Sequence, residues 1–336
     1  MILKRFILEF CFLSFTLLTA QEDYFISQSR FMQKENFSFF GYNNLNRVGV
    51  LYNTIQLDNE QNLDNKYFFG TLSFEEKKFS LGLDINSYKL ENSGLVSTLA
   101  NFVYVYQVKI ANELFFLPAI SFGIGNKGLV LNNIVFEDQL VSATGFINSE
   151  TRDPIGSSLG NVNYTDLGAS FILHNETFLL GLSLKHLNNP NVSFNKEGNQ
   201  TLPLNVVLNG AYEFNVNPFE RNFLPEHSYL LVYGSLTNKG SINTMYMSQE
   251  LQLGEFSFGI NQQLSYLNTF NFNNLGFSVG LSLENFDIGI LYNFGVKQID
   301  NVYAPAIFEL YLTFDFSKFR RNRRGLFKRL QIDNYF

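Results

Sequence analysis

The sequence predicts an all-β protein, a closed transmembrane antiparallel β-barrel of about 14 strands and of the outer-membrane type. Three observations predict it. Apolar and polar residues alternate with a period of two over long segments, the segments run to about ten residues, and short turns alternate with long loops between them. Lipid offers no hydrogen bonds to an open sheet edge, so a sheet with one lipid-facing side must close on itself.

The segment at residues 162–187 shows the pattern most clearly. Its first half alternates apolar residues with small or polar ones (Leu167, Ala169, Phe171 and Leu173 against Asp166, Gly168 and Ser170). A short polar turn follows at residues 174–176. The second half repeats the alternation (Phe178, Leu180, Leu182 and Leu184 against Gly181, Ser183 and Lys185). This pattern predicts a hairpin with one apolar face.

Strand-like segments with the same alternation recur along the chain. They lie at residues 45–57, 66–75, 77–89, 97–110, 113–125, 162–173, 177–187, 202–214, 228–237, 242–253, 255–267, 272–284, 286–296 and 305–316. The connections from odd-numbered to even-numbered segments tend to be longer: residues 58–65, 88–96, 126–161, 188–201 and 297–304. The exception is the connection 215–227, which is long but falls among the short turns. Pro118 lies within a segment and predicts a bulge, because proline cannot donate to a ladder.

A secreted β-sandwich would also alternate. Strand length disfavours it, because soluble strands are typically shorter. The polar faces are rich in Gly, Ser and Asn, which suits a crowded or watery lumen. Loop lengths that alternate along the chain are expected of a barrel and are not required of a sandwich. The barrel is therefore the favoured interpretation.

The N-terminus predicts export, and the rest of the chain divides into three parts. Residues 1–20 have the charge, apolar core and small-residue end of a signal peptide, and the only cysteine, Cys11, lies within them. We expect residues 21–44 to be a periplasmic or lumenal segment that lines or plugs the barrel; a loosely ordered leader is the alternative. The barrel is expected at 45–316, and a basic periplasmic tail at 317–336. That tail either holds an acidic partner or anionic lipid, or is simply solvated.

The composition excludes some functions. A net charge of −6 disfavours nucleic-acid binding. His174, His186 and His227 have no metal-ligand spacing, and no nucleophile or nucleotide motif appears. Pairing of Asp138 or Asp300 with His186 would give an enzyme at the barrel rim, but the interpretation of these residues as solvated rim residues is favoured. We therefore expect no catalytic residues, no metal and no cofactor.

The sequence leaves open whether the strand tyrosines lie at the membrane interface or inside the barrel. The chain has no Trp, so Tyr is available for the aromatic girdles that flank a membrane. Six tyrosines lie in the strand segments: Tyr104, Tyr106, Tyr233, Tyr246, Tyr292 and Tyr311. Girdle positions and packing or lumen positions are equally open for each of them.

The chain resembles the PorP/SprF-like outer-membrane proteins of the type IX secretion system of Bacteroidetes. Near the predicted cleavage site, the matching residues of the family's first two motifs are Asp23, Phe25, Ser27, Gln28, Asn36 and Gly41. The family's hairpin motif appears from Phe178 to Pro190 and includes Gly181, Ser183 and His186. Leu202-Pro203 at the start of the next strand also fits.

The resemblance implies a non-enzymatic role in secreting or anchoring large surface proteins such as adhesins. It implies partners of three kinds: a secreted surface protein with a type IX sorting domain, other type IX outer-membrane components, and membrane lipids. It also implies partner-binding roles for two sets of motif residues: Phe25, Ser27, Gln28, Asn36 and Gly41 near the N-terminus, and Gly181, Ser183, His186 and Pro190 in the hairpin motif. The tail arginines Arg320, Arg321, Arg323 and Arg324 are further candidates. A barrel that transports a small solute is the alternative function.

Overall fold

The structure is a computed structural model that describes residues 25–56, 62–91, 94–129, 139–141, 146–147, 161–175, 177–194, 198–219, 223–225, 228–240, 242–266, 270–283, 285–296, 298–299, 302–303 and 305–317. The predicted signal peptide and most of the basic tail lie outside these residues. Much of the predicted loop 126–161 also lies outside them.

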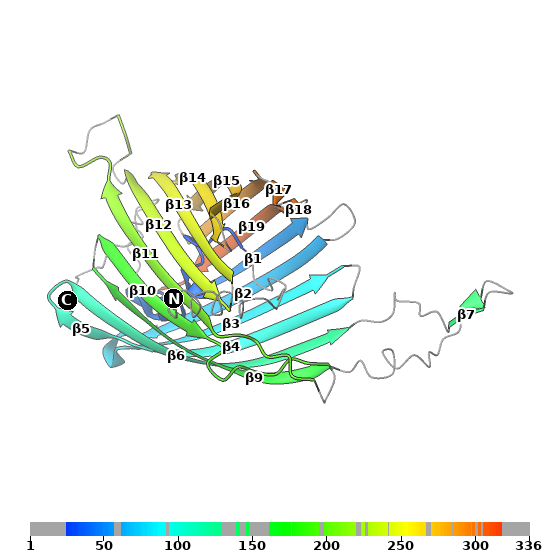
Figure 1. Cartoon of the computed structure of the whole chain (residues 1–336). Helices are drawn as coiled ribbons and strands as arrows, with labels where there is room; N and C mark the ends of the chain where they lie inside the picture. Colours follow the sequence, from blue (N-terminus) through cyan, green and yellow to red (C-terminus); the bar gives the residue numbers. More distant parts are fainter. Residues whose placement is uncertain are drawn as a thin grey trace, which may run out of the picture.

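Antiparallel strands form the closed 14-stranded barrel that the alternation predicts (Figure 1). The strands are β1 (Arg47–Gln56), β2 (Asn62–Phe74), β3 (Phe79–Leu90), β4 (Leu95–Tyr106), β6 (Leu114–Leu129), β9 (Val162–His174), β10 (Phe178–Lys185), β11 (Asn205–Asn215), β12 (Ser228–Lys239), β13 (Ile242–Leu253), β14 (Phe256–Tyr266), β15 (Phe270–Leu283), β16 (Phe286–Gly295) and β19 (Ala306–Asp315). Each pairs with its neighbours in sequence order. The first and last strands close the barrel in a register from Arg47↔Asp315 to Gln56↔Ala306.

Smaller elements complete the described chain. A short helix α2 (Met32–Glu35) and a 3₁₀ segment η1 (Phe37–Asn44) precede the barrel, and η2 (Glu75–Lys77) forms one turn. Two small hairpins, β7 (Leu140–Val141) with β8 (Phe146–Ile147) and β17 (Gln298–Ile299) with β18 (Val302–Tyr303), lie in the longer connections. No helix in the described part of the chain is both long and apolar enough to cross a membrane.

Pro118 lies where the wall is interrupted. The short strand β5 (Val108–Ala111) continues β4 along the same partner strand, β6, and Gln107 separates the two. The β4 ladder ends at Val105↔Ala119, and the β5 ladder begins at Val108↔Phe116. The proline therefore faces the break between the β4 and β5 ladders, while the ladder with β9 continues through Pro118↔Phe171.

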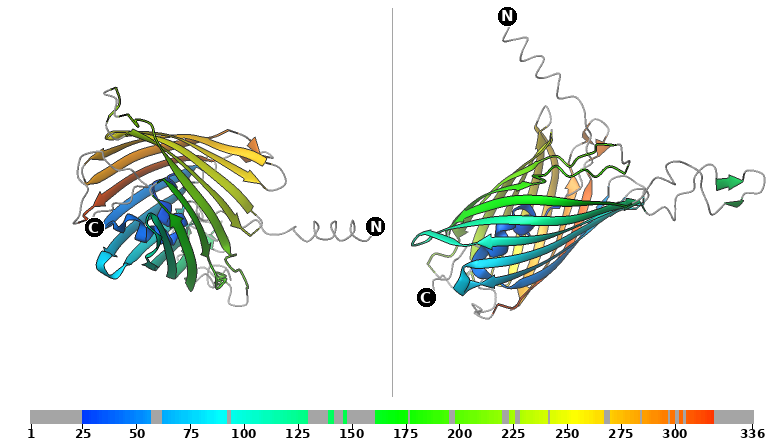
Figure 2. Two further views of the ribbon diagram at one scale, coloured as in Figure 1. Left: turned by 90° about the vertical axis from the view of Figure 1, so that its left-hand side faces the viewer. Right: turned by 90° about the horizontal axis from the view of Figure 1, so that it is seen from below.

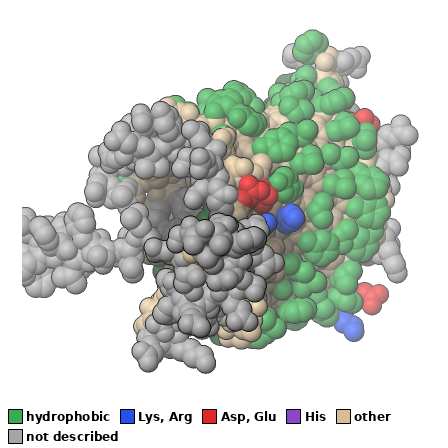
Figure 3. Space-filling model, turned by 90° about the vertical axis from the view of Figure 1, so that its right-hand side faces the viewer, with side chains coloured by type: hydrophobic (Ala, Val, Ile, Leu, Met, Phe, Trp, Pro, Cys, Tyr) green, Lys and Arg blue, Asp and Glu red, His purple; other side chains and the backbone are tan. Residues whose placement is uncertain are grey.

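The two faces of the wall differ as predicted. Apolar side chains project outward over its whole circumference, with Phe102 and Ile120 more than half exposed. On the side that Figure 3 shows, hydrophobic side chains cover much of the outer wall, with few charged ones among them. The opposite face is buried and is rich in Ser, Asn and Gly. An outer surface of this kind suits contact with acyl chains.

The structure resolves the open question about tyrosine. Tyr104, Tyr106 and Tyr292 project outward and are more than 40% exposed, which is compatible with girdle positions. Tyr233, Tyr246 and Tyr311 are buried in the lumen, so the girdle interpretation is wrong for these three. Each lies in phase with inward-facing neighbours on its strand.

Candidate functional site in the barrel lumen

The N-terminal segment occupies the inside of the barrel. Residues 25–44, here called the plug, enclose α2 and η1, and Figure 2 shows them within the ring of strands. Nearly every plug side chain is buried, including the polar Gln33, Lys34 and Glu35. Water inside the barrel would have left these side chains exposed. The described plug therefore packs closely against the inner face of the wall, and its side chains are excluded from water.

Local hydrogen bonds give the plug its shape. The carbonyl of Ser27 accepts the N–H groups of Arg30 and Phe31, both at 2.9 Å, which starts the first turn. The Asn36 side chain accepts the Ser38 N–H at 3.0 Å and caps η1. Asparagine is a favoured residue at such a cap, because its side-chain oxygen satisfies an N–H that the helix leaves free.

Aromatic packing joins the plug to the wall. Phe31 meets the rings of Tyr67, Phe69 and Tyr311 edge to face, at centroid distances of 6.1, 5.8 and 5.5 Å. Phe40 lies over Gly82 of β3, where an added Cβ would come within 2.4 Å of its ring. Small residues on the inner face thus leave room for the plug's large ones.

Glu309 of β19 binds the start of the plug. Its carboxylate accepts the backbone N–H groups of Ile26 at 2.6 Å and Ser27 at 2.9 Å, and the side-chain amide of Asn53 at 2.6 Å. All four residues are buried. Hydrogen bonds to a charged acceptor are stronger than neutral ones, so this contact fixes where the chain enters the lumen.

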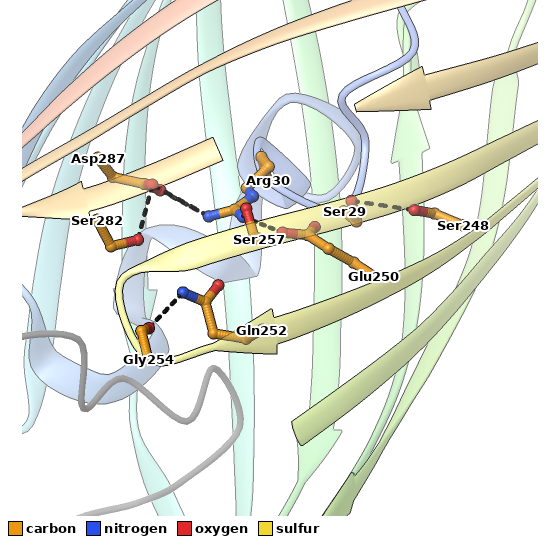
Figure 4. Close-up of polar contacts among 9 residues, drawn as sticks. All are labelled: Ser29, Arg30, Ser248, Glu250, Gln252, Gly254, Ser257, Ser282 and Asp287. Carbon is orange, nitrogen blue, oxygen red and sulfur yellow. Dashed lines mark hydrogen bonds and ion pairs between the residues drawn. The ribbon is translucent and has the colours of Figure 1, made fainter. Parts of the chain in front are cut away.

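Arg30 is the centre of a second polar contact (Figure 4). Its guanidinium contacts the carboxylates of Glu250 on β13 and Asp287 on β16, the latter at 2.9 and 3.1 Å, and donates to the Ser257 hydroxyl. Only 8% of the Arg30 side chain and 5% of the Glu250 side chain are exposed. A buried guanidinium needs such partners, because it remains charged at any physiological pH.

The third contact brings together the two motifs that the sequence singled out. The Asn36 side-chain amide donates to the Phe171 carbonyl and to Asn209 Oδ1, both at 3.2 Å, directly over Gly181 of β10. A Cβ at Gly181 would lie 2.6 Å from the amide nitrogen of Asn36. Because Gly181 of the hairpin motif has no side chain, it leaves the space that the Asn36 side chain of the N-terminal motif occupies.

The other described N-terminal motif residues are also buried or half-buried against the wall, whereas Asp23 lies outside the described residues. Phe25 lies under the Lys34 ammonium, 4.4 Å from ring centroid to Nζ. Gln28 accepts a hydrogen bond from the Ser235 hydroxyl. Gly41 lies against Val105, where an added Cβ would approach within 2.7 Å. Their contacts in this structure are with the barrel, so a direct partner-binding role for them stays a prediction.

The hairpin motif ends in an ordered loop. His186 has a φ of 61° and is buried, and its Nδ1 lies 3.0 Å from both carboxylate oxygens of Asp166. The Asn188 side chain binds the Leu167 N–H and the Thr165 carbonyl, which occupies the edge of β9 where β10 has ended. Ser183 is fully buried and faces the lumen. The carbonyl of Pro190 accepts the Leu202 N–H at 2.9 Å.

The interpretation of His186 as a solvated rim residue is thus wrong. Its acidic partner is Asp166, whereas the candidate partners Asp138 and Asp300 lie outside the described residues.

His174 is likewise buried, between the rings of Tyr42 and Phe115. His227 and the four tail arginines lie outside the described residues. Among those that are described, no cluster of three or more His, Cys, Asp or Glu is placed to hold a metal ion.

A cavity of about 140 Å³ remains between the plug and the wall, beside Arg30. Its lining includes Arg47, Gln252, Asp287 and Asp315, which are polar or charged side chains. The volume is room for a few water molecules.

Gly181→Ala tests the contact between the two motifs. The new methyl group would lie 2.6 Å from Asn209 Oδ1 as well as from the Asn36 amide nitrogen. It is therefore expected to displace both side chains and to lower the free energy of unfolding by about 1–3 kcal/mol, measured by urea titration in detergent micelles. Gly210→Ala on the next strand is the control, because its nearest neighbour would be 3.4 Å away. In an Asn36→Ala background the effect of Gly181→Ala should shrink. An undiminished effect there would show that the methyl group disturbs something other than Asn36.

The fold and this site define an outer-membrane barrel whose own N-terminal segment fills its lumen. The chain belongs to the PorP/SprF family of type IX secretion system membrane proteins, since the family's sequence profile matches residues 19–314. The resemblance that the two motifs suggested is therefore confirmed.

Three solved structures are similar to the chain at low sequence identity. CdiB from Acinetobacter baumannii is 12% identical with a TM-score of 0.43; the match covers 81% of this chain and 60% of CdiB. Omp33 from the same species is 10% identical with a TM-score of 0.43, over 82% of this chain and 100% of Omp33. A mutant of the monoaromatic hydrocarbon channel TodX is 10% identical with a TM-score of 0.46, over 80% of this chain and 88% of TodX. No curated protein sequence matches the chain.

Proposed function

We propose that this barrel is a non-enzymatic component of the type IX secretion system that helps to export large surface proteins or to hold them at the cell surface. Membership of the PorP/SprF family supports the system. The observation that carries the role is the plug: aromatic packing, Glu309, Arg30 and Asn36 all bind it within the wall. A barrel filled in this way is suited to binding a partner rather than to passing a solute.

The proposed orientation places both termini in the periplasm. The predicted signal peptide and the even number of strands favour it, because the chain then begins and ends on the same side. The longer connections, such as the one that follows Leu129, then face the outside, where loops form binding surfaces. The basic tail then lies in the periplasm, where an acidic segment of another type IX component or an anionic head group would complement its charge.

A deletion of the gene, complemented with the tagged wild-type chain, tests this function. Without the barrel, particular proteins with a type IX sorting domain should be lost from the cell surface. They should either be released into the medium or be missing from both the surface and the medium. The same proteins should be recovered with the tagged chain from outer membranes. An unchanged surface proteome, together with solute uptake by the purified chain in vesicles, would favour the transport alternative.

A further inference from the structure

The connection between β11 and β12 differs from its neighbours. It falls at the end of the barrel that carries the short connections, such as residues 254–255, and that end is here called the turn end. Two phenylalanines in this connection, Phe219 and Phe223, are 77% and 92% exposed. These are the highest exposures among the large hydrophobic side chains that the structure describes.

The base of this connection is ordered. Asn217 is buried; its N–H binds Asn215 Oδ1 at 2.9 Å, and its side-chain amide donates to the carbonyls of Leu224 and Pro225 at 3.4 and 3.3 Å. The Ser228 hydroxyl donates to the same Pro225 carbonyl at 2.9 Å. Asn217 thus joins both arms of the connection. The two phenylalanines are therefore presented on a fixed base.

The connection is also tied to the next turn along the wall. The ring of Pro225 packs on Gly254, between β13 and β14, where an added Cβ would lie 3.2 Å from the proline. Gly254 has a φ of +59°, which favours glycine at this turn. The connection thus bridges two adjacent hairpins at the turn end.

The described parts of the connection are residues 216–219 and 223–225. In Figure 1 and in the left view of Figure 2 these coloured parts project beyond the outline of the wall. The strand that leads into it carries Tyr212 and Phe214 on its outer face, with ring centroids 4.5 Å apart. Their exposed rings belong to the lipid-facing surface. The strand that carries these outward-facing rings thus leads directly into the connection that carries Phe219 and Phe223.

We propose that Phe219 and Phe223 insert into the lipid leaflet at the turn end and anchor the barrel at a fixed depth. Exposure of phenylalanine side chains to this extent is unfavourable in water, and transfer to an apolar environment stabilises each in proportion to the area removed from water. Aromatic side chains near a membrane interface anchor a protein in this way. With the orientation proposed above, the occupant is the phospholipid of the inner leaflet of the outer membrane.

The chain has no tryptophan, so the fluorescence of a single introduced tryptophan reports only on its own position. Phe223→Trp gives the full-length chain a single tryptophan at the proposed anchor, and Phe219→Trp is a second, independent probe. Phe258→Trp, on the outer face of β14, is the matched lipid-facing control. Each variant is reconstituted in phospholipid vesicles, with heat-modifiable gel mobility as the check that the barrel has formed.

We expect the Phe223→Trp emission to shift to the blue relative to the urea-unfolded chain. Phospholipids with brominated acyl chains should quench it, and iodide should not. Quenching by iodide without quenching by brominated lipid, at both anchor positions, would overturn the proposal and assign these residues to water or to a protein partner. The vesicles have phospholipid in both leaflets, so the result does not depend on orientation or on a type IX role, which the surface proteome tests separately.

Discussion

A chain that lacks residues 25–44 is expected to form an ion-conducting pore, whereas the intact chain should show no sustained channel currents in a planar bilayer. The inner face that the plug covers is polar, with buried Asn53, Asn209 and Glu309 among its side chains. Eight strands enclose just enough room for side chains, and 16–18 leave an aqueous channel. A 14-stranded wall without its plug should therefore admit water and ions, and cells that express it should take up large antibiotics several-fold faster.

The deletion has a matched control in a locked plug. Ser38 and Ser170 face each other with their hydroxyl oxygens 2.9 Å apart, one on the plug and one on β9. Ser38→Cys/Ser170→Cys is expected to form a disulfide, because the two side chains already lie against each other. The only native cysteine lies in the predicted signal peptide and does not compete. The oxidised variant should stay closed. Currents of equal size from the locked and the deleted chains would mean that the plug does not seal the barrel.

Much of the barrel could be predicted because strand alternation is local. Leu310 and Leu312 face outward while Glu309 and Tyr311 face inward, and this assignment needs only the period of two. The same phase would have placed Tyr311 in the lumen rather than in a girdle. Boundaries were less certain. β6 continues to Leu129 beyond the predicted residue 125, and β11 begins at Asn205 because Leu202 instead binds Pro190 in the loop.

The plug contacts could not be predicted in the same way. Residues 25–44 have no repeating pattern, and their partners lie far along the chain: Ile26 binds Glu309 across 283 residues. The resemblance identified Asn36 and Gly181 separately, but nothing in the spacing shows that one fits over the other. Arg30, Glu250 and Asp287 were missed. Their only sequence signal is that Glu250 and Asp287 carry charge on faces otherwise rich in Ser, Asn and Gly.

Arg30→Leu is expected to have the largest effect of any single substitution in the plug. The change removes the cation from between two carboxylates, and the Glu250 side chain is 5% exposed. Breaking a buried ion pair by removing one partner destabilises by about 3–5 kcal/mol, because the other charge stays buried and uncompensated. Asp287 contributes less, since 32% of its side chain is exposed and water screens it.

The free energy lost in Arg30→Leu should appear first as release of the plug, because the wall keeps its own ladders. Channel currents should therefore appear under conditions in which the heat-modifiable mobility of the barrel is unchanged. Arg30→Leu/Glu250→Gln is expected to recover much of the closed state, since it removes the uncompensated charge together with the cation. Arg30→Lys should be intermediate, because an ammonium keeps the charge but cannot donate to both carboxylates in the geometry of the guanidinium. If Arg30→Leu stays closed and is as stable as the wild type, the aromatic packing around Phe31 must hold the plug without the ion pairs.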